Sequence, residues 1–259
     1  MESWIKVIHL TSRVLEAAPL LLFLFLFVTG LSTPAKFKLL YFYVSIEAFL
    51  YVVKIFSRYI FHNDIYVYHI STFVSVVLLL KIYYKLFYAI DILKCISVAL
   101  WIFIIVSILD ASLFNGFFTN LNIYAQAFGG VILVGVAILH IVQLSWDNFA
   151  LMKQPEFFFS AAILFYFSCA IVTYVSSNIV YNSGYDTVTI IKLDRIISAP
   201  DAVLYAVHMG LLAWMFSFFP SSVNPLRALP RWLHYSRWHA RPYKVLWQPL
   251  NLHQSTVAN

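Results

Sequence analysis

The sequence predicts an all-α fold: a polytopic membrane protein built as a seven-transmembrane-helix bundle. Of the 259 residues, 62% are hydrophobic and only 11% are charged, whereas a soluble domain carries roughly 25% charged residues. The mean hydropathy is +0.83, and aromatic residues make up 19% of the chain, as is usual where side chains meet lipid and its interfaces. This composition excludes a soluble domain, a disordered chain and a disulfide-stapled scaffold.

Seven mainly apolar stretches have about the 20 residues that a transmembrane helix needs. Helical spacing over Trp4–Glu16 predicts that the first helix begins before its apolar core. Most connections are short and contain turn formers, such as Asn115-Gly116. We expect one longer loop, from Tyr181 to Ser198. The stretches are about Ala17–Leu31, Leu39–Phe61, Tyr68–Leu86, Lys94–Phe114, Ile123–Trp146, Phe157–Val180 and Ala199–Phe219.

The distribution of Lys and Arg predicts the orientation, because cytoplasmic loops carry an excess of both. The first, third and fifth loops and the tail together carry eleven of these residues, and the opposite side carries five. We therefore expect the N-terminus outside, the C-terminus in the cytoplasm, and a multi-pass protein of the bacterial inner membrane. This direction also favours a retained first helix over a signal peptide, which enters with its N-terminus inside.

Two parts are expected: a seven-helix transmembrane domain over residues 1–220, and a basic, aromatic-rich cytoplasmic juxtamembrane tail over residues 221–259. Cations in such a tail attract anionic lipid, and Trp and Tyr settle at headgroup level. The tail is thus interpreted as a membrane-surface anchor or as a docking surface for a cytoplasmic partner, and no nucleic acid is expected. Its basic residues are Arg227, Arg231, Arg237, Arg241 and Lys244.

Charged residues inside the spans mark the candidate site, because each is unfavourable by roughly 2.5–3.5 kcal/mol near the bilayer centre. Glu47, Lys54 and Arg58 share one face of the second span by their spacings of seven and four residues. Arg58 lies near the outer end, where it can extend to the interface. For Glu47 and Lys54 two interpretations stay open, a functional polar site and a structural link between helices.

The polar residues of the seven spans are concentrated toward their outer ends, which predicts a polar cavity open to the outer face. We expect Glu47 and Lys54 to point into the bundle. The partners expected at matching depth are His208 or Thr173 for Glu47, and Asp201 or Asp110 for Lys54. The predicted ligand-binding residues are Glu47, Lys54, Arg58, His69, Asp201 and His208.

Histidines, cysteines and glycines in the spans have structural interpretations. His69, His140 and His208 occur singly, without paired ligand spacing, so each predicts an interhelical hydrogen bond, and no metal or other cofactor is expected. Cys95 and Cys169 lie at different depths, which makes a disulfide improbable. Small residues allow helices to approach closely, and this role is expected for Gly129, Gly130 and Gly135.

Several short motifs are shared with one group of proteins. Asn63 to Ile70 (Asn-Asp-Ile-Tyr-Val-Tyr-His-Ile) opens the third span, Phe114-Asn115 forms a turn, and Tyr166-Phe167-Ser168 follows a Pro155-x-Phe157 entry. With these motifs the chain resembles a group of uncharacterised bacterial seven-transmembrane-helix proteins often encoded near two-component signalling genes. It departs from them over Thr72–Leu80, where an acidic residue would be expected. The resemblance implies an integral membrane protein with a sensory role, and it transfers no catalytic residue.

These observations predict a membrane sensor or receptor-like module without enzymatic activity of its own. Its outward-facing cavity would bind a small molecule or lipid, and its cytoplasmic loops and tail would contact a cytoplasmic or membrane signalling partner. The alternative is a small transporter or lipid-handling protein with Glu47 and Lys54 in the substrate path. A membrane-embedded enzyme or haem protein ranks third.

Overall fold

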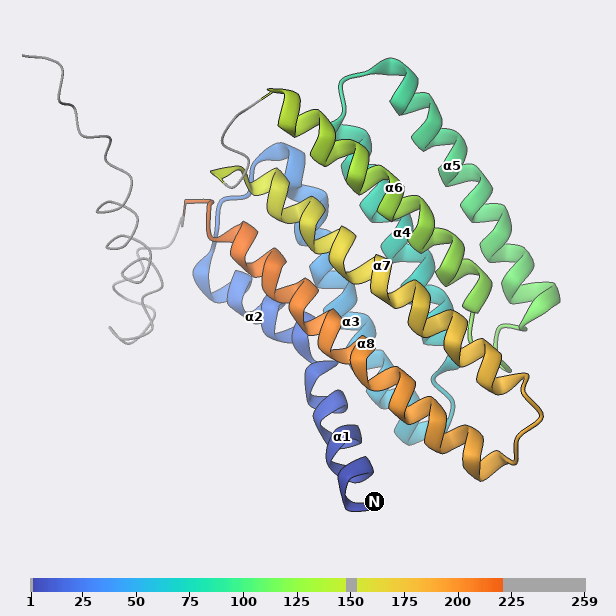
Figure 1. Ribbon diagram of the computed structural model, residues 1–259. Coiled ribbons are helices and arrows are strands. Elements are labelled where there is room, and N and C mark those ends of the chain that lie inside the picture. Colours follow the sequence, from blue (N-terminus) through green and yellow to red (C-terminus); the bar gives the residue numbers. More distant parts are fainter. Residues whose placement is uncertain (1, 148–152, 221–259) are drawn as a thin grey trace, which may run out of the picture.

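The computed structural model describes residues 2–147 and 153–220, and within these ranges the regular secondary structure is helical (Figure 1). The tail, residues 221–259, and the predictions made for it lie outside the described residues. The α-helices are α1 (Glu2–Leu15), α2 (Ala18–Thr29), α3 (Lys38–Ile60), α4 (Ile65–Leu86), α5 (Ile90–Leu109), α6 (Ile123–Asp147), α7 (Pro155–Tyr181) and α8 (Thr187–Phe216). A short 3-10 helix η1 (Ala35–Phe37) precedes α3, and a π-helical segment η2 (Asp110–Phe114) continues α5.

The described chain is a multi-pass membrane protein. Within it, seven helical segments are long and apolar enough to cross a membrane, which confirms the predicted number of spans. Their bounds are Leu10–Thr29, Ala35–Ile60, Ile65–Leu86, Ile90–Phe114, Ile123–Trp146, Pro155–Tyr181 and Ala199–Phe216.

The helix turns gather at two ends of the bundle (Figure 1). We call one the Lys36 end; it holds residues 30–37 and 87–89 and the last turn of α8. We call the other the Asp64 end; it holds residues 61–64, 115–122 and 182–186. At the Lys36 end, the Ser32 backbone N–H donates to the Pro220 carbonyl over 2.9 Å, so the turn before η1 is tied to the end of α8.

The N-terminal segment is helical before the first apolar core, as its spacing predicted. It is broken into α1 and α2 at Glu16 and Ala17, and Pro19 stands in the first turn of α2, where a proline is tolerated. α1 packs against α8, while Val7, Leu10 and Val14 are exposed. The break places Glu16 where α1 ends, beside the interior of the bundle.

The loop expected from Tyr181 to Ser198 is wrong, because α8 begins at Thr187 and leaves only residues 182–186 between α7 and α8. Asp186 caps the helix, its side chain accepting the backbone N–H of Thr189 over 3.1 Å. Hydrogen bonds from the Thr189 hydroxyl and backbone N–H lower the pKa of this carboxyl. Pro200 lies inside α8 without ending it. The charged segment before the predicted span is therefore the first part of α8.

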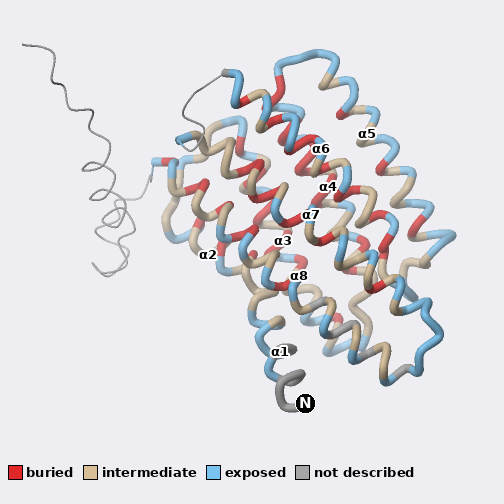
Figure 2. The backbone as a smooth tube through the Cα atoms, viewed as in Figure 1, coloured by how far each residue is buried: buried red, intermediate tan, exposed pale blue. Residues whose placement is uncertain are grey.

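The helices pack around an apolar core that is densest toward the Lys36 end. α7 lies between α6 and α8, and α3 lies between α2 and α4. α5 is at the edge of the bundle, where only Ile96 and Phe103 of its side chains are buried (Figure 2). Most of α5 therefore faces lipid.

Two glycines let α6 approach its neighbours closely. A Cβ added at Gly129 would lie 2.7 Å from Val76 Cγ2, and one added at Gly130 would lie 2.9 Å from Ile171 Cγ1. The predicted close packing is confirmed at these two positions. At Gly135 it is wrong, because an added Cβ meets nothing within 4 Å there.

Candidate functional site

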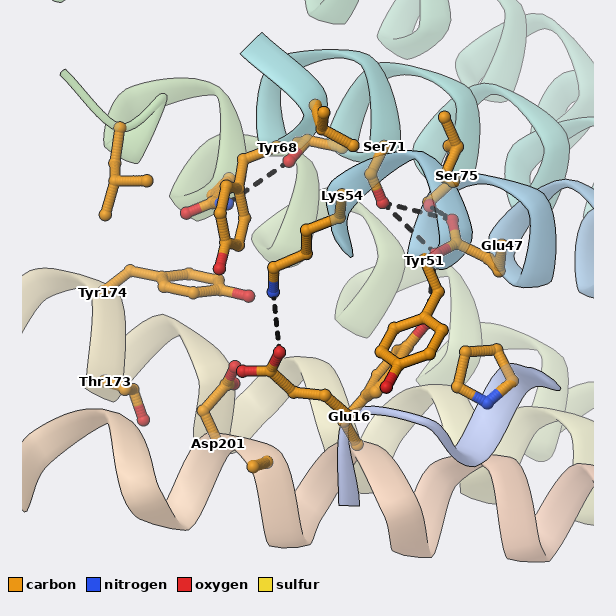
Figure 3. Close-up of a pocket in the computed structure, with 18 of the residues that line it drawn as sticks. Glu16, Glu47, Tyr51, Lys54, Tyr68, Ser71, Ser75, Thr173, Tyr174 and Asp201 are labelled. Carbon is orange, nitrogen blue, oxygen red and sulfur yellow. Dashed lines mark hydrogen bonds and ion pairs between the residues drawn. The ribbon is translucent and has the colours of Figure 1, made fainter. Parts of the chain in front are cut away.

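A cavity of about 440 Å³ lies in the half of the bundle toward the Asp64 end. Its wall comes from the end of α1 and from α3, α4, α6, α7 and α8, and it contains several tyrosines besides charged and hydroxyl side chains (Figure 3). The volume falls in the range of small-molecule sites. The charged side chains of the wall are Arg13, Glu16, Glu47, Lys54, Arg58 and Asp201.

Glu47 points into the bundle, as predicted, and is 5% exposed. Its carboxylate accepts the hydroxyl of Ser71 over 3.2 Å, that of Tyr205 over 3.0 Å, and that of Ser75 (Figure 3). The expected partners His208 and Thr173 are wrong, because neither hydrogen-bonds to Glu47 in the described chain. Three hydroxyl donors thus join α3 to α4 and α8 through one acceptor.

Lys54 also points into the bundle, where its ammonium forms an ion pair with Glu16. Lys54 Nζ lies 2.9 Å from Glu16 Oε2 and 4.3 Å from the centre of the Tyr68 ring. The expected pairing with Asp201 or Asp110 is wrong, since Glu16 takes this place. The pair connects the last third of α3 to the break between α1 and α2.

Asp110 binds groups near the start of α6 and does not pair with Lys54. Its carboxylate is fully buried, accepts the side-chain amide of Asn115 over 2.5 Å, and accepts the backbone N–H of Ala125 over 2.8 Å. It therefore fastens η2 to the start of α6 and lies outside the cavity wall.

Arg58 lies at the rim of the cavity, with its side chain 34% exposed. Its Nη2 and Nε donate to Asp64 Oδ2 over 2.6 and 3.1 Å. Because Asp64 immediately precedes α4, this pair joins the end of α3 to the start of α4.

Asp201 points from α8 into the cavity, toward Glu16 and Lys54 (Figure 3). Lys54 attracts this carboxylate and Glu16 repels it. Its Oδ1 atom is buried and has no hydrogen-bond partner among the described residues. A buried carboxylate oxygen without a donor is unfavourable, which marks Asp201 as the unsatisfied group of the wall.

The predicted site residues His69 and His208 lie outside the cavity wall. His69 Nε2 lies 3.0 Å from the Asn120 carbonyl, so this histidine fastens the turn before α6. His208 is fully buried; its Nδ1 donates to the Ala162 carbonyl over 2.9 Å, and Nε2 lies 3.4 Å from the Tyr43 hydroxyl. A carbonyl can only accept, so the proton is on Nδ1.

The predicted interhelical hydrogen bonds are confirmed for His208, between α8 and α7, and for His140, whose Nδ1 lies 2.7 Å from Ser160 Oγ on α7. For His69 the prediction is wrong, because its partner lies in a turn. Cys95 and Cys169 are free thiols. Over residues 2–147 and 153–220, no three His, Cys, Asp or Glu side chains group as metal ligands would.

A buried layer closes the cavity toward the Lys36 end. On α3 and α4 the layer contains Leu40, Leu79 and Tyr83, and on α7 and α8 it contains Ile163 and Leu212, all with exposed fractions of 0%. Beyond it lies a second cavity of about 280 Å³. That cavity is lined by Lys36, Lys85, His140, Gln143 and Glu156, among others, and Lys36 pairs with Glu156.

Sequence reasoning missed the hydroxyl groups that hold Glu47. The signal was present in α4, where Ser71 and Ser75 are four residues apart and so share one face of the helix. Tyr205 gave no comparable signal, since the chain contains 17 tyrosines.

The chain matches no protein-family model, no curated protein and no solved structure.

Proposed function

We propose that this protein is an integral membrane sensor or receptor-like module that binds a small molecule in the larger cavity, without enzymatic activity of its own. One observation carries the proposal: a wall of charged and hydroxyl side chains ends against a fully buried apolar layer. Because the apolar layer closes the cavity at one end, a small molecule would enter and leave it from the same side of the membrane.

The orientation supports the same proposal. The excess of Lys and Arg in the loops and tail favours an orientation with the Lys36 end in the cytoplasm of a bacterial cell and the Asp64 end outside its inner membrane. The larger cavity then faces the outside. A signalling partner would meet the short turns of the Lys36 end and the basic tail.

Accessibility of a cysteine in the cavity tests this proposal. Thr173 lines the cavity, and Thr173→Cys is placed in a background of Cys95→Ser and Cys169→Ala. A membrane-impermeant thiol reagent should modify it in intact spheroplasts and not in inverted membrane vesicles. Leu79→Cys, in the buried layer, is the matched control and should react from neither face.

Reaction of Thr173→Cys in inverted vesicles would overturn the proposal. Failure to react from either face would contradict an open cavity.

A transporter is the second candidate, and the second cavity favours it. On α4, Ser75 of the larger cavity and Lys85 of the smaller one are ten residues apart, which is about 15 Å of helix. Two polar vestibules separated by a thin apolar layer suit alternating access. Reaction of Leu79→Cys from both faces would select this candidate.

A further inference from the structure

The cations of the larger cavity already have partners or lie at its mouth. Lys54 pairs with Glu16, and Arg58 pairs with Asp64. Arg13, the third cation of the wall, is exposed. An anionic ligand that binds Lys54 or Arg58 would therefore have to displace a carboxylate from its partner.

The remaining carboxylates of the wall have no ion pair in the described chain. Glu47 is held by hydroxyl donors alone. Asp201 has a buried oxygen atom without a hydrogen-bond partner. The interior of the cavity thus has more carboxyl groups than cationic groups, and Asp201 is the carboxyl group that lacks a donor.

The cavity also shows how it holds an ammonium group. Lys54 Nζ has a carboxylate oxygen at 2.9 Å and the face of the Tyr68 ring at 4.3 Å. A cation within about 6 Å of a tyrosine ring centre is attracted by the ring electrons. Lys54 is in effect a primary amine tethered to α3.

Asp201 offers a second place of the same kind. Tyr166 and Tyr174, whose hydroxyl oxygens are 3.2 Å apart, line the cavity and interact electrostatically with Asp201. A carboxylate beside tyrosines is present here, and among the described residues no cationic side chain forms an ion pair with it.

We propose that the ligand of this cavity is a small organic cation with an ammonium group, bound with Asp201 as its counter-ion and tyrosine rings around it. This inference rests on the proposed function, because it names the ligand class of the same site. A protonated amine would donate to the unpartnered Asp201 oxygen, and its carbon skeleton would take the remaining volume.

Three probes of one skeleton separate the ligand classes: 2-phenylethylamine, 2-phenylethanol and phenylacetate. Binding to the purified full-length protein is measured by equilibrium dialysis and by the shift in thermal denaturation temperature. We expect the amine to bind at least tenfold more tightly than the alcohol and the acid. Tighter binding of phenylacetate, or equal binding of all three, would overturn the inference.

Variants of Asp201 locate the counter-ion. Asp201→Asn should weaken binding of 2-phenylethylamine at least tenfold, because a charge-assisted hydrogen bond becomes a neutral one. Asp201→Glu should keep the preference for the amine, and it is the variant to test if Asp201→Asn does not fold. Asp91→Asn, which removes an exposed carboxylate on α5 outside the cavity wall, is the matched control and should leave the affinity unchanged. Unchanged affinity in a folded Asp201→Asn variant would refute the assignment.

Removal of the tethered amine gives an independent test. Lys54→Ala deletes a fragment equivalent to n-propylamine and leaves Glu16 facing the vacated space. Propylamine should then raise the denaturation temperature of the variant more than that of the unmodified protein, and n-propanol should not. Equal shifts would contradict the ammonium site.

Failure of these probes is distinguishable from failure of the proposed function. The cysteine test reports whether the cavity opens to one face, and it does not depend on ligand charge. One-sided labelling with a preference for the acid would retain a receptor and overturn only the ligand class.

Discussion

Replacing Glu47 with leucine should lower the free energy of unfolding, whereas Glu47→Gln should preserve most of it. Ser71, Ser75 and Tyr205 all donate to this one carboxylate. Leucine removes the shared acceptor and leaves three hydroxyl groups facing a side chain that cannot accept. Glutamine keeps one carbonyl oxygen, and its amide can donate to hydroxyls that rotate to accept.

The magnitude follows from the number of bonds. Interhelical hydrogen bonds in membrane proteins contribute about 0.6 kcal/mol each on average, so loss of three amounts to about 2 kcal/mol. The two serine hydroxyls can turn back to carbonyls of their own helix, which reduces the loss. We therefore expect about 1–2 kcal/mol for Glu47→Leu and less than about 0.5 kcal/mol for Glu47→Gln.

Reversible unfolding in mixed micelles, titrated with sodium dodecyl sulfate and followed by circular dichroism, measures this difference. Tyr205→Phe removes a single donor and should be less destabilising than Glu47→Leu. The two changes combined should be less destabilising than the sum of the single effects, because they break the same bond. Ser45→Ala is the control, since the Ser45 hydroxyl bonds only to the Tyr41 carbonyl of its own helix, over 2.8 Å.

Two results would refute this reasoning. The first is a free energy of unfolding for Glu47→Leu that is less than about 0.5 kcal/mol below that of the unmodified protein, where a loss of about 1–2 kcal/mol is expected. It would mean that the hydroxyls do not depend on the carboxylate. Glu47→Gln as destabilising as Glu47→Leu would assign the effect to the negative charge and not to hydrogen bonding.

Three further predictions concern packing, orientation and the tail. Gly129→Ala should lower the free energy of unfolding by about 1–3 kcal/mol through overpacking, because the added Cβ meets Val76 Cγ2 at 2.7 Å. Gly135→Ala is the control and should not lower it, because an added Cβ there meets nothing within 4 Å. Equal effects of the two substitutions would contradict the packing of α6. A reporter fused after Asn259 should be active only in the cytoplasm, and periplasmic activity would reverse the orientation. Deletion of residues 231–259 should leave a folded, membrane-inserted protein by size-exclusion chromatography, and loss of that species would make the tail structural.

Much of the fold was readable from the sequence, because apolar length alone identifies a membrane span. The number of spans and the helical start before the first one are confirmed. The extent of α8 was not readable, since apolar length marks only the part of a helix that crosses the membrane. A helix can carry charges beyond the membrane, and the Asp186 cap fixes where this one begins.

The partners of the buried charges were less predictable. Glu47 and Lys54 were expected to point inward, and both do. The partner of each of these two side chains depends on how every helix is rotated about its axis. An apolar sequence does not define that rotation. Glu16 was missed as the partner of Lys54, because the first helix was expected to run through this residue without the break at Glu16 and Ala17.

Pro200 gives α8 an uneven stiffness. A proline has no N–H to donate, so the carbonyl of Ile196, one turn earlier, has no helical partner. The helix therefore resists bending least at the residue before Asp201. Asp201 follows this proline directly and lines the cavity. A ligand bound to the Asp201 carboxylate would therefore contact α8 beside the turn that has one backbone hydrogen bond fewer.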